Sequence, residues 1–363
     1  SSDVCSSDLG GTLTNDSYLI YGYWASSGGL QTVNSGDISG SGAFYSYISA
    51  DANFETTSIS MSGIFNLYSY NSTEKYTLNG NVSMPNLDIA TYRRSVSVYT
   101  NTHNLTVKNI YFGDSSGGSE VYGDTLKLYM SSGTHTINGN LVLAPNNTSN
   151  THVLDFGSSN ITIKGDVDLS SIDVTPGTST VTLAGTSNQS ITSASQAFYN
   201  LTVTNNSSSP GVTFVDVLDV DHLFKCITAS ATLTFTASTT STLNDIELDG
   251  QASGTRIVIQ STSTTAANWN VASSTQTDVS YVSVSYNNAS SGQEIDASNG
   301  TNYDGDNNTN WLFVSGITIS GTIYTAENKS TNIGSDKTVN LSINGGSAVT
   351  AETISGGVFS FSS

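Results

Sequence analysis

Residues Ile161-Thr-Ile-Lys-Gly-Asp-Val-Asp-Leu169 decide the fold of this chain. Apolar side chains alternate with polar ones along this stretch, so one face carries isoleucine, valine and leucine and the other carries threonine, lysine and aspartate. A period of two is typical of a strand with one buried face. Gly165 stands between the two alternating runs. The nine residues therefore predict a strand, a bend and a second strand.

The same pattern recurs, which indicates a stack of repeating units. Further copies are Tyr76–Met84, His135–Leu143 and, more weakly, Thr180–Gly185. An Asn-Gly pair between alternating apolar residues is usually a hairpin turn. Two copies instead carry Lys164-Gly165 and Ala184-Gly185, and a type I′ turn needs positive φ at both central residues. The glycines are therefore predicted to mark inward-facing bends or bulges at the corners of a solenoid.

The spacing of the repeats supports this interpretation. The central glycines of the four copies are 59, 26 and 20 residues apart. Steps of about 20 to 30 residues suit one turn of a β-solenoid, with two or three turns in the first interval. The motif Asn-Leu-Thr-Val also occurs twice, at residues 104–107 and 200–203, 96 residues apart. Both copies are predicted to be strands bordered by bends.

Composition narrows the class of protein. The 363 residues include only 11% charged side chains, against about 25% in an average soluble protein. Serine, threonine, asparagine and glycine take their place, so we expect almost no helix. Ten basic residues against 29 acidic ones give a net charge of −19, which disfavours nucleic acid and anionic lipid as partners. No apolar run approaches the ~18 residues of a membrane span, so no membrane insertion is expected here.

The first nine residues, Ser1–Leu9, read as a translated sequencing adapter rather than as protein sequence. Such a segment carries no information about the fold. The chain proper then starts near Gly10, and we expect it to be an internal piece of a longer protein. Cys5 falls within the adapter-like stretch. Cys226 is predicted to be a small buried apolar residue.

From Thr180 onward the motifs resemble the repeat region of bacterial secreted parallel β-helix surface proteins, which are adhesin-like. The resemblance covers roughly residues 60 to 313 and rests on Thr180–Thr192, Phe198–Val203, Leu233–Phe235, Ile246–Gly250, Arg256–Ile259, Trp269–Val271, Val279–Val284 and Asn307–Trp311. It implies a right-handed parallel β-helix exported to the cell surface. The predicted fold class is therefore all-β: a right-handed parallel β-helix, or β-solenoid, over residues 10–313, followed by a partial β-sandwich.

The sandwich is predicted over residues 314–363. Ile317–Tyr324, Thr338–Gly345 and Gly357–Phe361 look like the opening strands of a truncated bacterial immunoglobulin-like or carboxypeptidase-regulatory-like module. However, Ile317-Thr-Ile-Ser-Gly also matches the repeating pattern. One further solenoid turn is the alternative.

The densest group of ionisable residues is Asp216, Asp219, Asp221 and His222. On a strand, Asp219 and Asp221 would share a face, and paired carboxylates can act as general acid and base on a polysaccharide. Val215, Val217 and Val220 do not keep one alternation with these aspartates, and solvated aspartates on an outer face explain the group without any chemistry. A lyase acting on uronic acids would also need cations near its substrate, and the three arginines and seven lysines are scattered.

Calcium is the candidate cofactor, and no other is expected. Asp304, Asp306 and Asn308 match the first three alternate ligand positions of a calcium loop. The match then fails, since Thr309 stands at the sixth position and Ser315 at the twelfth. A polar turn is the alternative. The histidines His103, His135 and His152 have no metal-ligand spacing.

These features favour a non-catalytic structural or adhesive segment of a large exported surface protein, located at the cell surface or outside the cell. Its partner would be a surface ligand, such as a glycan or the surface of a host or neighbouring cell. Two alternatives stay open. One is a polysaccharide-degrading enzyme that depends on Asp219 and Asp221. The other is a carbohydrate-binding module that uses tyrosines and Trp24 near the amino end.

Overall fold

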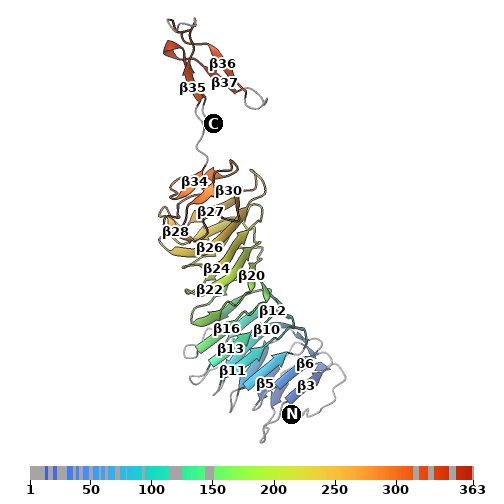
Figure 1. Ribbon diagram of the computed structural model, residues 1–363. Helices are drawn as coiled ribbons and strands as arrows, with labels where there is room; N and C mark the ends of the chain where they lie inside the picture. The colour runs from blue at the N-terminus through green and yellow to red at the C-terminus, as the bar shows by residue number, and fades with distance from the viewer. Residues whose placement is uncertain are drawn as a thin grey trace. The chain divides into compact units, whose positions relative to one another are not determined.

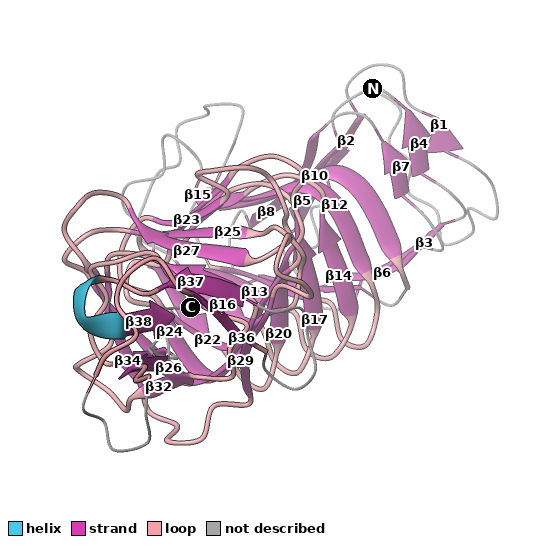
Figure 2. Cartoon of the chain, turned by 90° about the horizontal axis from the view of Figure 1, so that it is seen from above, coloured by secondary structure: helices cyan, strands magenta, loops and turns pink. Residues whose placement is uncertain are grey.

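The structure is a computed structural model built almost wholly of strands (Figures 1 and 2). It describes the backbone of strands between residues 13 and 78, and then residues 80–91, 95–113, 125–143, 151–313, 319–325, 331–342 and 349–361, with most side chains from residue 75 onward. In these ranges the only helical segment is the short 3-10 turn Ser355–Gly357, the cyan ribbon of Figure 2. None of the described helical structure is long and apolar enough to cross a membrane. The expectation of almost no helix is confirmed.

The chain divides into two compact units, residues 1–313 and residues 314–363. The first is a β-solenoid of about nine turns, whose strands lie one above another in Figure 1. Neighbouring turns pair in parallel throughout their described strands, and three long ladders run through the stack. Up to residue 175 each described turn passes from the first to the second to the third of these sheets and then moves up by one strand spacing, about 4.8 Å, whereas the third sheet has no described strand beyond residue 175.

The strands of the three sheets are as follows. The first contains β12 (Leu105–Phe112), β14 (Thr134–Ile137), β17 (Asn160–Ile163), β20 (Thr180–Leu183), β22 (Ala197–Val203), β24 (Asp219–Cys226), β26 (Thr240–Asp249) and β29 (Asp278–Ser280). The second contains β2 (Leu19–Gly22), β5 (Phe44–Ile48), β8 (Ile64–Ser69), β10 (Val82–Thr91), the end of β12, β15 (Leu141–Leu143), β18 (Val167–Asp168), β21 (Gln189–Thr192), β23 (Val212–Phe214), β25 (Thr232–Phe235), β27 (Ile257–Ser261), β30 (Val282–Val284) and β33 (Tyr303–Asp304). The third contains β3 (Gln31–Ser35), β6 (Ala52–Thr56), β9 (Glu74–Leu78), β11 (Val96–Tyr99), β13 (Thr125–Tyr129), β16 (Thr151–Asp155) and β19 (Ile172–Thr175).

Shorter ladders complete the first unit. They join β1 (Leu13–Thr14), β4 (Ile38–Gly40) and β7 (Ile59–Met61), then β26, β28 (Ala267–Val271) and β31 (Asn287–Asn288), and finally β32 (Ile295–Ala297) and β34 (Trp311–Phe313). Strand β26 starts beside β28 and ends beside β29. One strand therefore bends around a corner from one ladder to another.

The core consists of columns of apolar side chains from equivalent positions of successive turns. One column of the first sheet is buried along its whole length and contains Val107, Ile137, Ile163, Leu183, Val203, Cys226, Leu248 and Val279. Both Asn-Leu-Thr-Val motifs contribute their valine to it, Val107 and Val203. The 96 residues between the motifs therefore span whole turns. Cys226 is buried among aliphatic neighbours, as predicted.

Three copies of the repeated pattern are in register. His135 pairs with Ile161, and Ile161 pairs with Val181, so their glycines all lie at the corner between the first and second sheets. The prediction that these glycines turn corners is confirmed. The first copy is different, because Tyr76 belongs to β9 of the third sheet and pairs with Val98.

The first interval of 59 residues therefore spans two turns and one extra side rather than whole turns. The physical reason is that every corner of the coil joins two half-buried strands. The same alternating pattern with a central glycine can therefore occur at any corner of the coil.

The second unit has antiparallel pairing. Strand β35 (Ile319–Thr322) pairs with β38 (Val358–Phe361), and β36 (Thr338–Leu341) pairs with β37 (Val349–Glu352). The predicted fold class is confirmed, and the two small antiparallel sheets are compatible with a partial sandwich. The immunoglobulin-like identity of this unit stays a prediction.

Candidate functional site

Asp216, from the predicted catalytic group, supports the backbone of the preceding turn. Its carboxylate accepts the N–H groups of Ser193 at 2.8 Å and Ala194 at 2.6 Å. Ala194 and Ser195 both have positive φ, which is uncommon for residues with a side chain. The carboxylate therefore stabilises a sharp corner, and this role accounts for Asp216 without any chemistry.

A β-bulge in β24 accounts for the positions of Asp221 and His222. Phe198 pairs with Val220 and Asn200 with Leu223, so one residue of β22 faces two residues of β24. Strand β26 on the other side shows the same shift. The extra residue breaks the apolar alternation of the sequence in this region. Bulges of this kind re-aim side chains and are common beside functional sites.

His222 is exposed but held by two neighbouring turns. Its ring stacks on Tyr199, with centroids 4.9 Å apart and the planes 6° from parallel. Its Nδ1 atom lies 2.7 Å from Oδ1 of Asn200. On the other side, the side-chain amide of Asn244 donates to the carbonyl oxygen of His222 at 3.2 Å. Contacts with both neighbouring turns therefore fix the position of His222 at the bulge.

Asp219 and Asp221 interact electrostatically. Burial raises the pKa of Asp219, and the nearby charge of Asp221 raises it further. A carboxyl group with a raised pKa stays protonated to higher pH, as a general acid must. Cleavage of a glycan at Asp219 and Asp221 stays a prediction.

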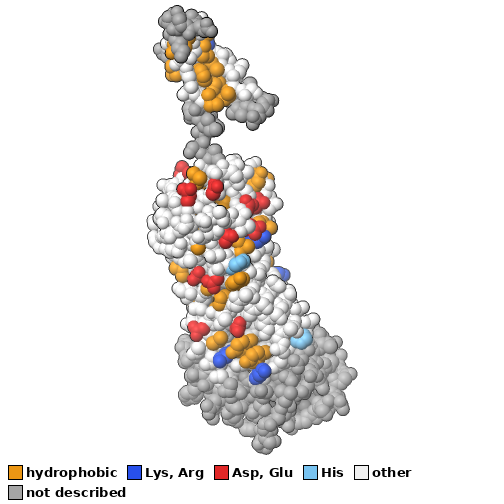
Figure 3. Space-filling view, in the orientation of Figure 1, with side chains coloured by type: hydrophobic (Ala, Val, Ile, Leu, Met, Phe, Trp, Pro, Cys, Tyr) orange, Lys and Arg blue, Asp and Glu red, His pale blue; other side chains and the backbone are white. Residues whose placement is uncertain are grey.

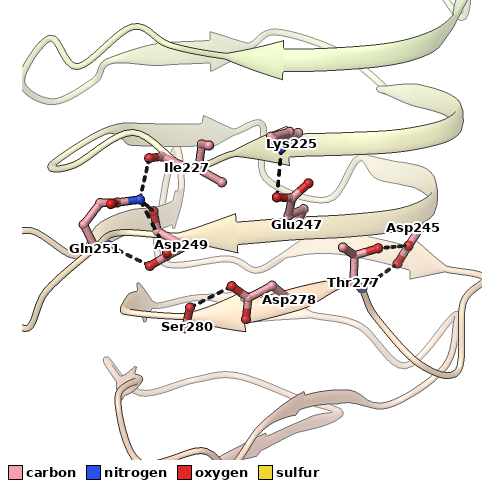
Figure 4. Close-up of polar contacts among 9 residues, drawn as sticks. All are labelled: Lys225, Ile227, Asp245, Glu247, Asp249, Gln251, Thr277, Asp278 and Ser280. Carbon is pink, nitrogen blue, oxygen red and sulfur yellow. Dashed lines mark hydrogen bonds and ion pairs between the residues drawn. The ribbon is translucent and has the colours of Figure 1, made fainter.

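A strip of carboxylates on the first sheet was missed by sequence reasoning. Asp245, Glu247 and Asp249 alternate on the outer face of β26, and Asp278 of β29 lies in register with Glu247 (Figure 4). The alternation Asp-x-Glu-x-Asp at residues 245–249 was the available signal. The neighbouring Asp278 was hidden by its distance along the chain. We call these four residues the acidic strip.

All four carboxylates of the acidic strip have partners. Glu247 forms an ion pair with Lys225 at 2.8 Å, and Asp245 accepts both the N–H and the hydroxyl of Thr277. Asp249 accepts the N–H of Gln251 at 2.7 Å. Figure 3 shows acidic side chains spread over the visible face of the solenoid, with few basic ones. No group of three or more aspartate, glutamate, histidine or cysteine side chains in the described ranges is arranged to hold a metal ion.

A polar hollow of about 380 Å³ lies beside the acidic strip. It is formed by the loop that precedes β29 and by the segment around β32, and its lining includes Thr275, Gln276, Asp278, Asp296, Ser298 and Asn299. We call it the β29 hollow. The sequence pattern did not predict this hollow, because its two walls come from different turns.

The predicted calcium loop is a hydrogen-bonded turn. Oδ1 of Asp304 accepts the N–H of Asp306 at 3.0 Å and the side-chain amide of Asn308 at 2.7 Å. The oxygen of Asn308 accepts the N–H of Asn287 in the preceding turn at 3.0 Å. The side-chain oxygen of Asn308 therefore bonds to the backbone of the preceding turn, and its amide group, not its oxygen, faces Asp304. Calcium binding here stays a prediction and would require Asn308 to give up these bonds.

Several of the aromatic side chains that the structure describes are packed against each other, whereas Tyr303 is 58% exposed. Tyr99 and Tyr129 stack on adjacent turns with centroids 4.4 Å apart and planes 5° from parallel, and Nζ of Lys75 lies 4.7 Å from the centre of the Tyr99 ring. Both faces of Tyr99 are therefore covered, and a sugar ring has no access to them. The predicted sugar contact at Trp24 lies outside the described residues.

Two of the three histidines, His135 and His152, are buried. His135 is fully buried and His152 is 1% exposed, and each bonds to a backbone carbonyl oxygen, that of Met130 and that of Ser171 respectively. Both side chains therefore pack in the core of the solenoid. Comparison of the chain with protein-family models, with curated proteins and with solved structures found no match.

Proposed function

We propose that this chain is a non-catalytic structural or adhesive segment of a large exported cell-surface protein. The observation that carries the proposal is a ladder of side-chain hydrogen bonds that joins successive turns. It runs through Asn86, Asn109, Asn140, Asp166 and Ser190, and each of its four bonds is 2.8 Å long. Polar groups that an enzyme would direct at a substrate are used here to join one turn to the next.

The ladder supports a mechanical role. In a solenoid each turn contacts only its neighbours, so stiffness depends on how well adjacent turns are joined. Parallel backbone pairing, buried apolar columns and the side-chain ladder all act between the same pairs of turns. A second set of bonds repeats the arrangement at another corner, where Asn81 accepts the N–H of Asn104 and Asn104 accepts the N–H of Thr134. A stack joined in this way holds its ends at a fixed separation.

The composition supports exposure outside the cell. Few charged residues and many serines, threonines and asparagines provide a polar surface that does not depend on ion pairs. The net charge of −19 keeps such a surface away from phosphate backbones and anionic lipids. The partner would then be a glycan or the surface of another cell.

Glycan cleavage is the alternative, and the raised pKa of Asp219 is the observation that favours it. Incubation of the chain with neutral and acidic polysaccharides tests the choice. We expect no release of oligosaccharides. Release that is abolished by Asp219→Asn, but retained by the matched change Asp249→Asn, would overturn the non-catalytic proposal.

The complete gene tests the surface location. We expect its reading frame to encode an export leader and a wall or membrane anchor. A reading frame with neither would contradict the proposal.

A further inference from the structure

We propose that the β29 hollow binds a neutral, hydroxyl-rich ligand, a sugar unit of a glycan, through the carboxylates of Asp278 and Asp296. This inference rests on the adhesive role in the proposed function and names its class of ligand. It assigns the site to residues that do not belong to the predicted catalytic group or to the predicted calcium loop.

The size and lining of the hollow suit a small polar molecule. Its volume of about 380 Å³ lies within the range of about 300 to 1,000 Å³ that is usual for ligand sites. The one apolar residue of its lining, Val279, is only 5% exposed. Hydroxyl, amide and carboxylate groups form the rest of the wall, so an apolar ligand would find little surface to bury against.

The walls are fixed before any ligand arrives. Gln276 donates to the carbonyl oxygens of Ser273 at 2.7 Å and Glu294 at 3.2 Å, and its own oxygen accepts the N–H of Asp296 at 3.2 Å. Asn299 donates to the carbonyl oxygen of Val279 at 2.9 Å. These bonds tie the loop of one turn to the next turn. A rigid site loses little conformational entropy when its ligand binds.

Each carboxylate has one oxygen in use and one uncommitted. Oδ2 of Asp278 accepts the hydroxyl of Ser280 at 3.0 Å, and Oδ1 of Asp296 accepts the N–H and the hydroxyl of Ser298. The other oxygens, Oδ1 of Asp278 and Oδ2 of Asp296, accept no hydrogen bond from the part of the chain that the structure describes. The bonds from Ser298 also lower the pKa of Asp296, which favours its charged form. The hollow therefore offers two carboxylate acceptors, which the hydroxyls of Ser280 and Ser298 orient.

A ligand that binds these acceptors must donate hydrogen bonds. Hydrogen bonds to a charged acceptor are shorter and stronger than those between neutral groups. Each uncommitted carboxylate oxygen is therefore a favourable acceptor for one sugar hydroxyl. No lysine or arginine is among the lining residues, which excludes uronic acids and sulfated sugars on charge grounds. Within the described ranges no third acidic, histidine or cysteine ligand joins the two carboxylates, which disfavours a metal ion. A neutral sugar meets both conditions.

The test measures binding of neutral, acidic and amino-sugar oligosaccharides to the full chain by glycan array and then by calorimetry, at up to about 10 mM because a single small site binds near the millimolar range. We expect a neutral oligosaccharide to bind, and Asp278→Asn and Asp296→Ala each to weaken it at least tenfold. Asp249→Asn is the matched control, since Asp249 lies on the neighbouring strand outside the hollow, and should bind like the unchanged chain. Circular dichroism and thermal unfolding check that each variant keeps its fold.

Three outcomes would overturn the inference: no neutral oligosaccharide binds, binding survives both substitutions in folded variants, or only the amino-sugar oligosaccharides bind. The export leader and anchor expected of the complete gene do not depend on any of these results. Failure of the site is therefore distinguishable from failure of the proposed surface role.

Discussion

Gly139 and Gly165 meet at the same corner of two adjacent turns, where the N–H of Gly165 donates to the carbonyl oxygen of Gly139 at 2.9 Å. A Cβ atom on Gly165 would overlap the carbonyl group of Gly139. Neither residue has positive φ. Glycine is required here by the close approach of two backbones, and not by the left-handed conformation that glycine usually serves.

Gly165→Ala should therefore destabilise the solenoid by about 1–3 kcal/mol, the usual cost of adding a methyl group where the backbone must move. The measurement is the free energy of unfolding from urea titration followed by circular dichroism. Gly254→Ala is the control, because a Cβ atom there meets nothing within 4 Å. Its stability should be unchanged or slightly higher. Equal stability of the two variants would show that the corner has room.

Asp166→Ala should weaken the side-chain ladder. The change removes the acceptor for the N–H of Ser190, and a single hydrogen bond contributes about 0.5–1.5 kcal/mol. Asp166→Asn keeps an oxygen in the same place and should lose less than half as much stability. Urea titration of the two variants checks the difference. A loss that is the same for both would mean that the charge, rather than the bond, matters at this position.

The local pattern in the sequence was sufficient to predict the solenoid. Alternation in Ile161–Leu169 predicted the buried face, and Lys164 and Ala184 before their glycines argued against hairpins. The sequence did not reveal which corner each copy occupies. The pattern around Tyr76 is the same as that around His135, yet the two lie on different sheets. Register depends on pairing between turns, which local alternation does not encode.

The candidate site was harder to predict for a similar reason. Asp216 and Asn308 stood out in the sequence as acid and amide groups, but both bond to the backbone of the preceding turn. Asp278 and Asp296 stood out less, and the fold brings them to one hollow. In a solenoid, neighbours in space are about one turn apart in sequence. A variable turn length therefore hides them.

Cys226 should be unreactive in the folded chain. Burial raises the pKa of its thiol to about 11, and it lies in the aliphatic column between Val203 and Leu248. Since the thiolate is the reactive form, a thiol reagent at pH 8 should label Cys226 only after unfolding in urea. The time course of labelling of the peptide that contains Cys226, measured by mass spectrometry with and without urea, checks this and distinguishes Cys226 from Cys5. Rapid labelling of Cys226 without urea would contradict the burial.

Substitution of the same residue tests the column. Cys226→Val should be tolerated, whereas Cys226→Asp should destabilise the chain strongly, because an unpaired charge would be buried among aliphatic side chains. Thermal unfolding of the two variants gives the comparison. Similar midpoints for both would mean that the column does not pack as described.

Acid should destabilise the solenoid below pH 6.5 because of His135 and His152. Burial lowers the pKa of both side chains, and it outweighs the hydrogen bonds to Met130 and Ser171 that act in the opposite direction. The unfolded chain, with histidine pKa values near 6.5, then binds protons more readily than the folded one. The contribution of neutral histidine to stability is therefore complete above pH 6.5 and is lost as the pH falls below it. Urea midpoints at pH 7.5 and 5.5 should differ, with the lower value at pH 5.5. His135→Gln should reduce that difference, whereas the exposed His222→Gln should leave it in place, and equal midpoints at the two pH values for the unchanged chain would refute the assignment.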